Sequence, residues 1–363
     1  MKITFFSHYY FPEGNAPATR VFNLCSNWAK RGHVVRVITG VPNVPRGKPY
    51  AGYKNKWHQQ ECLDAVVVTR VWTYMAPNRG VVRRTINYLS YMVSALWRFA
   101  FTDKPDVVVA TSPQFFCAWA GLLASRLKRI PFVLEIRDIW PESISAVSKD
   151  TFPSFGVNKV AVRVLEWMEK RMYSSAVQIV TVGEGYKEQL IARGVSPEKI
   201  IVIPNGVDIK AFSPTPESTE FRELAGANEG DCLIGYIGTV GMAHSIETLV
   251  DAAHLAQLGG LTRFRFVVVG DGARLKHVKA HSEQLGCKNI HFLGLRPKAE
   301  MRDWLASLDV CVVHLKNTPL FQSVLPSKMF EAMAMRKPIA LGVKGHALSV
   351  LEKASAGIPF EPE

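Results

Sequence analysis

The feature that most constrains the fold is a unit of strand, glycine-containing loop and helix that occurs once near the start of each half of the chain. In the first copy, a strand at Lys2–Ser7 leads through a loop containing Gly14 to a helix at Ala18–Arg31, and a further strand follows at His33–Thr39. Strands joined by helical crossovers form a parallel sheet with helices on both faces. The first half therefore predicts a doubly wound α/β domain.

The second copy begins at Cys232 and has the same order of elements. The stretch Cys232–Gly241 predicts a strand that runs into a glycine loop, and a helix at Ile246–Leu258 and a strand at Phe264–Gly270 follow. Two such units in 363 residues predict an α/β protein with two doubly wound Rossmann-like domains that face each other across a cleft.

The segment between the two units indicates where one domain ends. A Pro- and Glu-containing stretch at Ser213–Gly230 follows Val207, so we place the domains at residues 1–207 and 208–363. Within the first domain, Val41–Asp64 is polar and rich in Pro, Gly and Lys, which predicts a mobile surface loop.

Composition excludes several classes of protein. With 48% hydrophobic and 21% charged residues, the chain is not disordered. Its six cysteines form no CxxC pair and no metal-binding spacing, which favours a reduced, cytoplasmic protein. No signal peptide is visible, and the longest apolar-rich stretch, Tyr88–Phe101, is too short to span a bilayer.

The formal net charge of +13 lies entirely in the first half. Met1–Val180 holds 24 Lys and Arg against 11 Asp and Glu, whereas the remaining residues hold 20 of each sign. This asymmetry predicts an anionic partner. No zinc finger, RNP-like aromatic motif or lysine-rich tail is present, so we expect an anionic membrane surface and no nucleic acid.

Two basic amphipathic helices support the membrane interpretation. One is predicted at Ile86–Phe101, just after Arg83 and Arg84, and the other at Gly156–Tyr173. Such helices can lie on anionic lipid, and the alternative is that they pack into the core. We expect peripheral association with the inner face of the cell membrane.

Near the C-terminus, Leu325–Ala340 predicts a turn, a helix and a strand, with Pro326 in the first helical turn and the Ser327 hydroxyl as the capping group. A helix N-terminus beside Lys328 suits an anion, and Glu331, one turn later, can accept hydrogen bonds from hydroxyl groups. Diphosphate plus ribose fits both features. The alternative is a solvated helix face.

A second charged group follows the predicted strand Pro131–Ile136. Arg137 and Asp138 come directly after it, at the edge where open α/β sheets bind ligands. The alternative is a local ion pair.

Together, several motifs resemble the retaining glycosyltransferases of GT-B fold that form the fourth family of the usual classification. The motifs are Tyr10–Gly14 with Ala16–Arg20, Arg137–Ser143, Ile203–Asp208, Val269–Gly272, Phe292–Gly294 and Pro326–Glu331. More narrowly, the chain resembles bacterial transferases of L-fucosamine or N-acetyl-L-fucosamine.

The resemblance implies a role for each matching residue. Asp138 and Lys328 would be catalytic. Asn15, Arg20 and Arg137 would bind the acceptor. The donor would be bound by Gly14, Thr239, Arg296, Ser327, Lys328, Met329 and Glu331.

The chain departs from the family pattern in three places. Ser323 stands where the family has its first glutamate, and Thr239 and His244 lie near the positions of a missing basic pair. Lys328 is then the best candidate to neutralise a diphosphate. The sequence also stops at Pro359–Glu363, where the family usually continues with further helices.

The implied activity is transfer, with retention, of a sugar from a nucleotide-diphosphate sugar to a lipid-linked diphosphate saccharide in O-antigen or capsule synthesis. The donor would be a UDP-sugar, with UDP-N-acetyl-L-fucosamine as the narrower candidate. No cofactor and no metal ion are expected. The alternatives are an epimerase or a phosphorylase on the same fold, and a non-catalytic membrane scaffold.

Overall fold

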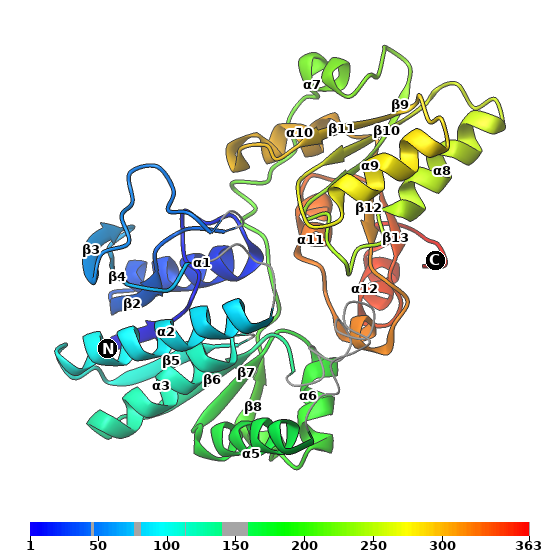
Figure 1. Ribbon diagram of the computed structural model, residues 1–363. Helices are drawn as coiled ribbons and strands as arrows, with labels where there is room; N and C mark the ends of the chain where they lie inside the picture. Colours follow the sequence, from blue (N-terminus) through cyan, green and yellow to red (C-terminus); the bar gives the residue numbers. More distant parts are fainter. Residues whose placement is uncertain (45–46, 76–80, 113, 140–158, 363) are drawn as a thin grey trace. The chain divides into compact units, whose positions relative to one another are not determined.

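The computed structural model describes residues 1–44, 47–75, 81–112, 114–139 and 159–362. The chain forms two compact units, Met1–Pro204 (unit 1) and Asn205–Glu363 (unit 2) (Figure 1). Each unit contains its own sheet with helices on both faces, which confirms the predicted α/β class with two Rossmann-like domains.

The strands of unit 1 are β1 (Lys2–Phe6), β2 (Val34–Gly40), β3 (His58–Leu63), β4 (Val66–Val71), β5 (Val107–Thr111), β6 (Phe132–Ile136), β7 (Gln178–Thr181) and β8 (Ile200–Val202). Its helices are α1 (Ala16–Lys30), α2 (Val81–Ala100), α3 (Phe115–Lys128), α5 (Lys159–Ser175) and α6 (Glu184–Ala192), with a short 3₁₀ turn, η1 (Pro197–Lys199).

The sheet of unit 1 has the strand order β3-β4-β2-β1-β5-β6-β7-β8. All its neighbouring pairs are parallel except β3 and β4. The carboxyl ends of β1, β2, β4, β5, β6 and β7 therefore lie at one edge, and the loops that leave this edge are where such sheets place ligands.

The first helix begins slightly earlier than predicted. The Asn15 side chain accepts a hydrogen bond from the Ala18 N–H at 2.9 Å, which caps α1, and Pro17 fits the first turn because its missing N–H would have no helical partner. Val21 and Cys25 of α1 pack on Phe5 and Val37 of the sheet.

The expected mobile loop at Val41–Asp64 is wrong, because β3 lies within it. Strand β3 pairs antiparallel with β4 at the edge of the sheet, and its residues alternate between exposed and half-buried. Its sequence, HQQECL, is mostly polar, so hydrophobic alternation could not reveal it.

The strands of unit 2 are β9 (Cys232–Ile237), β10 (Phe264–Val269), β11 (Ile290–Gly294), β12 (Val310–His314), β13 (Ile339–Gly342) and β14 (Gly357–Pro359). Its helices are α7 (Thr219–Leu224), α8 (Glu247–Leu258), α9 (Leu275–Gln284), α10 (Met301–Ser307), α11 (Ser327–Ala334) and α12 (His346–Ala354), with 3₁₀ turns η2 (Lys298–Glu300) and η3 (Pro319–Ser323).

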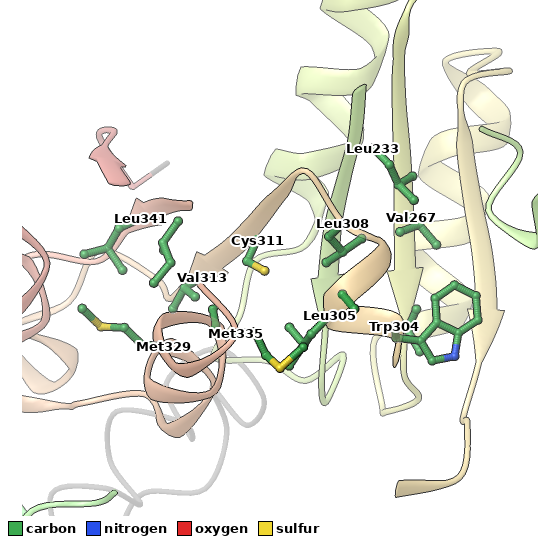
Figure 2. Packing of buried hydrophobic residues seen from close by; sticks show 14 of the residues in the cluster. Leu233, Val267, Trp304, Leu305, Leu308, Cys311, Val313, Met329, Met335 and Leu341 are labelled. Atoms are coloured by element: carbon green, nitrogen blue, oxygen red, sulfur yellow. The ribbon is translucent and has the colours of Figure 1, made fainter. Parts of the chain in front are cut away.

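The sheet of unit 2 is parallel, with the order β11-β10-β9-β12-β13-β14. Successive residues of β10 point to opposite faces, so Val267 enters a core with Trp304 and Met329, while Val268 packs with Val250 of α8. Figure 2 shows the first of these cores, in which Leu308, Cys311 and Leu341 lie between the sheet and α10 and α11. Both faces of the sheet are therefore buried.

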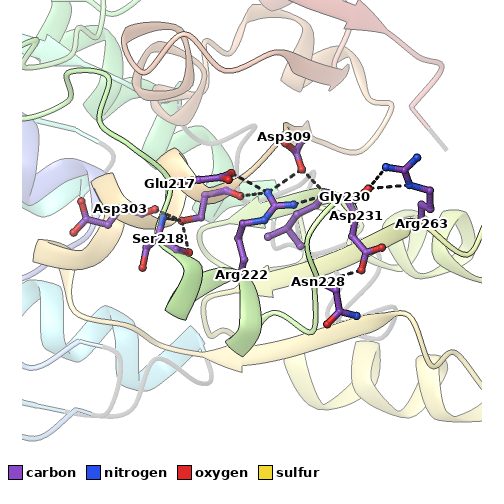
Figure 3. Close-up of polar contacts among 11 residues, drawn as sticks. Glu217, Ser218, Arg222, Asn228, Gly230, Asp231, Arg263, Asp303 and Asp309 are labelled. Atoms are coloured by element: carbon purple, nitrogen blue, oxygen red, sulfur yellow. Dashed lines mark hydrogen bonds and ion pairs between the residues drawn. The ribbon is translucent and has the colours of Figure 1, made fainter.

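A polar network secures the beginning of unit 2 (Figure 3). Arg222 of α7 is buried and donates to the Ser307 carbonyl at 3.0 Å, the Asp309 carboxylate at 3.0 Å and the Asp231 carbonyl at 2.6 Å. Next to it, Phe221 stacks on Trp304 with ring centroids 4.4 Å apart. These contacts hold α7 against the starts of β9 and β12.

Candidate active site

The start of α11 is the centre of the candidate site in unit 2. The helix begins at Ser327 after Pro326, whose extended backbone (φ −64°, ψ 125°) forms the N-cap without a side-chain hydrogen bond. The expectation that Ser327 would cap the helix is therefore wrong, because Ser327 is already its first residue. Its N–H and that of Lys328 have no acceptor within the helix.

Met329 has a different environment from these two residues. Its N–H donates to the Pro326 carbonyl at 3.1 Å, and its side chain is fully buried in the core (Figure 2). Met329 therefore anchors the first turn of α11 to the core. Its backbone N–H already donates to Pro326 and is not free to bind a ligand.

Lys328 has the most unusual environment in the site. Its Nζ is buried without a hydrogen-bond partner in the described part of the chain and lies 3.7 Å from the centroid of the Tyr236 ring. Burial lowers the pKa of Lys328 to about 7, an effect that the Glu331 carboxylate partly opposes. An unpaired buried amine is costly, so the position favours an anion that would pair with it.

The elements around Lys328 leave space for its amine. A Cβ on Gly238, just after β9, would stand 2.9 Å from Lys328 Nζ, and φ of Gly238 is +147°. Gly270, after β10, approaches the same turn so closely that a Cβ there would lie 1.8 Å from the Gly238 carbonyl oxygen. These two glycines let the ends of β9 and β10 meet beside α11.

An aromatic and histidine group forms the wall behind Lys328. The Tyr236 hydroxyl donates to the Thr239 carbonyl at 2.7 Å, and His314 Nδ1 lies 2.8 Å from the His244 carbonyl. Burial, together with the nearby Lys328 charge, lowers the pKa of His244 to about 3. His244 is therefore neutral at pH 7 and does not replace the missing basic pair. Thr239 itself is exposed.

Glu331 lies one turn into α11 and is half-buried. Burial raises the pKa of its carboxyl group, and the charges of Lys298 and Lys328 oppose this effect. Lys298 was not identified from the sequence, because η2 and α11 are far apart along the chain and only the fold brings them together. The guanidinium carbon of Arg296 lies 5.9 Å from the centroid of the Trp304 ring. The Nε atom of Arg296 is buried and has no hydrogen-bond partner in the described ranges.

Unit 1 holds a second charged group at the carboxyl end of β6. The Nε and Nη1 atoms of Arg137 are buried with no hydrogen-bond partner among the described residues. Burial raises the pKa of Asp138 to about 6, while Arg137 and a hydrogen bond from Tyr186 oppose the increase. The remainder of this motif, Trp140–Ser143, lies outside the described residues.

Of the other predicted residues of unit 1, Arg20 and Asn15 have structural partners. Arg20 donates to Glu135 Oε1 at 2.8 Å and to the carbonyls of Ile203 at 2.8 Å and Pro204 at 3.1 Å, so it joins α1 to β6 and to the end of the unit. Asn15 caps α1, and Gly14 is exposed in the preceding loop with nothing within 4 Å of a built Cβ.

Comparison with known proteins decides the family. Residues 15–206 match the family described as "Glycosyl transferase 4-like domain", and residues 231–363 match "Glycosyl transferases group 1". The chain is a glycosyltransferase.

Among curated relatives, the glycosyltransferase is 23% identical to the putative colanic acid biosynthesis glycosyl transferase WcaI of Escherichia coli K12, over 92% of this chain and 81% of that protein. It is 28% identical to the probable glycosyltransferase WbjE of Pseudomonas aeruginosa, over 69% of this chain and 59% of the relative. A third relative is an Escherichia coli UDP-Gal:alpha-D-GlcNAc-diphosphoundecaprenol alpha-1,3-galactosyltransferase. It is 24% identical over 76% of this chain and 62% of that protein.

Solved structures support the GT-B fold of this glycosyltransferase. Sucrose-phosphate synthase from Thermosynechococcus elongatus superposes with a TM-score of 0.72 at 16% sequence identity. Anabaena HepE in complex with UDP-glucose superposes with a TM-score of 0.70 at 19% sequence identity. Each comparison covers 100% of this chain and 86% of the other.

Two residues of the glycosyltransferase near its N-terminus were missed by sequence reasoning. Glu13 is buried and accepts from the N–H groups of Asn43 at 2.9 Å and Val44 at 3.1 Å, while burial raises its pKa to about 7. His8 is buried among Tyr9, Tyr88 and Tyr91 at the end of β1, and burial lowers its pKa to about 3. Both residues lie in the loop between β1 and α1, before Gly14, and their polar side chains were the signal available in the sequence.

Proposed function

We propose that unit 2 of this glycosyltransferase binds a UDP-sugar and that the enzyme transfers the sugar with retention of its anomeric configuration. The observation that carries the proposal is the Nζ of Lys328 at the N-terminus of α11, which is buried over the Tyr236 ring without a hydrogen-bond partner among the described residues, with Glu331 one turn later. A diphosphate would pair with the amine and the helix N–H groups, and ribose hydroxyls would donate to Glu331.

The chemistry places the greatest demand on the leaving diphosphate. As the anomeric bond breaks through an oxocarbenium-like state, negative charge accumulates on the diphosphate, and Lys328 with the dipole of α11 would stabilise it. The acceptor hydroxyl would attack from the same face and give its proton to the leaving phosphate. Asp138 and Arg137 of unit 1 would orient the acceptor or the transferred sugar.

For the acceptor we propose a lipid-linked diphosphate saccharide in the synthesis of a bacterial surface polysaccharide. The Escherichia coli relative whose acceptor is a diphosphoundecaprenol-linked sugar supports this choice. UDP-N-acetyl-L-fucosamine is the narrower donor proposal, and O-antigen or capsule is the product class.

Helix α2 supports a membrane-facing role for unit 1. One face of the helix packs Tyr91 and Phe99 into the core. The alternative that α2 is a core-packing helix therefore applies to this face only. The other face exposes an apolar stripe along the whole helix, comprising Val82, Ile86, Leu89, Val93 and Trp97, and continuing to Phe101. The helix has no acidic residue and carries exposed Arg83 and Arg84.

Helix α5, also in unit 1, adds a smaller patch of the same character. In α5, Trp167 is 63% exposed and Val164 is 49% exposed, beside exposed Arg163, Lys170 and Arg171. In the described residues no helix is long and apolar enough to cross a membrane. We propose that α2 and α5 lie on the anionic inner face of the cell membrane, where the acceptor lipid would be presented.

A donor screen tests the function. UDP-, GDP- and dTDP-sugars are incubated with a lipid-diphosphate N-acetylhexosamine, and the anomeric configuration of the product is read by NMR. We expect transfer from a UDP-sugar with retention. Conversion of the donor without an acceptor would indicate an epimerase, phosphate-dependent cleavage of a glycosidic bond would indicate a phosphorylase, and no nucleotide binding in calorimetry would indicate a scaffold.

A further inference from the structure

A pocket at the edge of unit 1 lies outside the residues assigned so far. It has a volume of about 330 Å³ and is lined by Trp57 and Trp72. Trp57 immediately precedes β3, Trp72 immediately follows β4, and the Trp72 N–H donates to the Trp57 carbonyl at 3.2 Å. Because β4 is parallel to β2, the pocket lies at the carboxyl edge of the sheet, where α/β folds bind ligands.

The two indole rings form a right-angled corner. Their centroids are 5.9 Å apart and their planes are inclined at 86°. Trp57 is 70% exposed, and neither indole N–H has a hydrogen-bond partner among the residues that the structure describes. A tryptophan this exposed contributes little to the core, and its large apolar face and free donor remain available to a ligand.

The corner is held in place by its surroundings. The Asn55 amide donates to the Thr73 carbonyl at 2.8 Å and accepts from the Thr73 N–H at 3.3 Å, which clamps the segment before Trp57 to the segment after Trp72. Below it, the fully buried Arg70 pairs with Glu61 of β3 and donates to the Gly40 carbonyl at 3.2 Å. The backbone that carries the two rings therefore needs little ordering when a ligand binds.

The shape and chemistry of the corner fit a pyranose ring. A pyranose has an apolar C–H face that can stack on one indole and a rim of hydroxyl groups that can accept from indole N–H donors. A bilayer fits less well, because the chain next to Trp57 is polar: Lys54, Asn55, Lys56, His58, Gln59 and Gln60. The exposed face of α2, by contrast, carries a continuous apolar stripe from Val82 to Trp97.

We propose that Trp57 and Trp72 form a subsite for a pyranose residue of the saccharide acceptor. This inference rests on the proposed function, since it names where unit 1 would hold a sugar other than the one transferred. It assigns acceptor recognition to a hairpin that carries none of the residues predicted from sequence.

Binding and kinetics test the subsite separately. In fluorotryptophan-labelled enzyme, with resonances assigned through Trp57→Phe and Trp72→Phe, we titrate methyl glycosides of glucose, galactose, N-acetylglucosamine and fucose. At least one should shift the Trp57 and Trp72 signals and leave the Trp97 signal unchanged. No shift with any glycoside would overturn the subsite even if sugar transfer is observed.

The kinetic arm uses the lipid-diphosphate saccharide acceptor. For Trp57→Ala we expect the acceptor KM to rise about fivefold to tenfold, with kcat and the donor KM unchanged, and a smaller rise for Trp57→Phe. Leu258→Ala, which removes a 70% exposed apolar side chain from α8 of unit 2, is the control and should leave the acceptor KM unchanged. An unchanged acceptor KM, or a loss of vesicle binding in Trp57→Ala, would overturn the proposal. If no acceptor is used at all, the proposed function fails while the glycoside titration still decides the subsite.

Discussion

At the scale of single residues, Lys328 links ligand binding to protonation. Its folded-state pKa of about 7 lies below the ordinary lysine value of 10.5. Between these values the unfolded chain holds a proton that the folded chain lacks, so this residue makes stability rise with pH across that window. Below pH 7 the full penalty of a buried ammonium is present.

Substitution of Lys328 by methionine should therefore separate stability from binding. We expect Lys328→Met to unfold at a higher urea concentration than wild type below pH 7, with the difference shrinking toward pH 10.5. UDP affinity of the wild type should fall by up to about tenfold per pH unit above pH 7, because the diphosphate is already ionised and Lys328 loses the proton that pairs with it. In calorimetry the variant should bind weakly at every pH, and equal affinity in the two proteins would contradict the assignment.

Glu331 provides a test of ribose recognition at the same scale. If its carboxylate accepts from the ribose hydroxyls, Glu331→Ala should weaken UDP binding by about tenfold to a hundredfold. Wild type should also bind deoxy-UDP more weakly than UDP, whereas the variant should bind the two nucleotides with equal affinity. Persistent discrimination between UDP and deoxy-UDP in Glu331→Ala would place ribose recognition elsewhere.

At the scale of elements, the apolar stripe of α2 should decide vesicle binding. The double variant Val93→Asp, Trp97→Asp adds two charges to the exposed face and leaves Tyr91 and Phe99 in the core. We expect flotation with phosphatidylglycerol vesicles to fall about tenfold or more, and wild-type binding to weaken with salt. Leu258→Asp, on the 70% exposed Leu258 of α8 in unit 2, is the control and should float as wild type does. Equal vesicle binding by all three proteins would refute the proposal that this face of α2 binds the membrane.

The attachment of α7 is a second property of elements. Arg222→Leu removes the buried guanidinium that joins α7 to Ser307, Asp309 and Asp231, and we expect a loss of about 2 kcal/mol in the free energy of unfolding. Arg302→Leu removes an exposed ion pair with Asp303 and should cost less than about 0.5 kcal/mol. Urea denaturation of the two variants compares them, and similar losses would show that the network in Figure 3 adds little.

At the scale of the whole molecule, each unit has its own hydrophobic core and sheet. The proposed donor residues Thr239, Arg296, Lys328 and Glu331 all belong to unit 2. We therefore expect residues 205–363 expressed alone to fold cooperatively and to bind UDP within about threefold of the full chain. A folded fragment that does not bind UDP would contradict a donor site in unit 2, and an unfolded one would contradict its independence.

Local pattern predicted most elements of this chain. The helix at Ile246–Leu258 and the strands at Pro131–Ile136 and Phe264–Gly270 agree with the structure within a residue at each end. Buried parallel strands are short apolar runs and their helices end at glycine or proline, so sequence alone carries both signals. The edge strand β3 was missed because a polar strand has no such signal.

The sequence by itself determined the two α/β domains, the basic first half, and the pairing of Lys328 and Glu331 on one helix, because each depends on neighbours along the chain. Only the tertiary structure decided that Lys328 is buried over Tyr236, that His244 is neutral, that Lys298 lies near Glu331, and that Trp57 meets Trp72. Burial and charge act through space, and they come from elements that the chain separates by many residues.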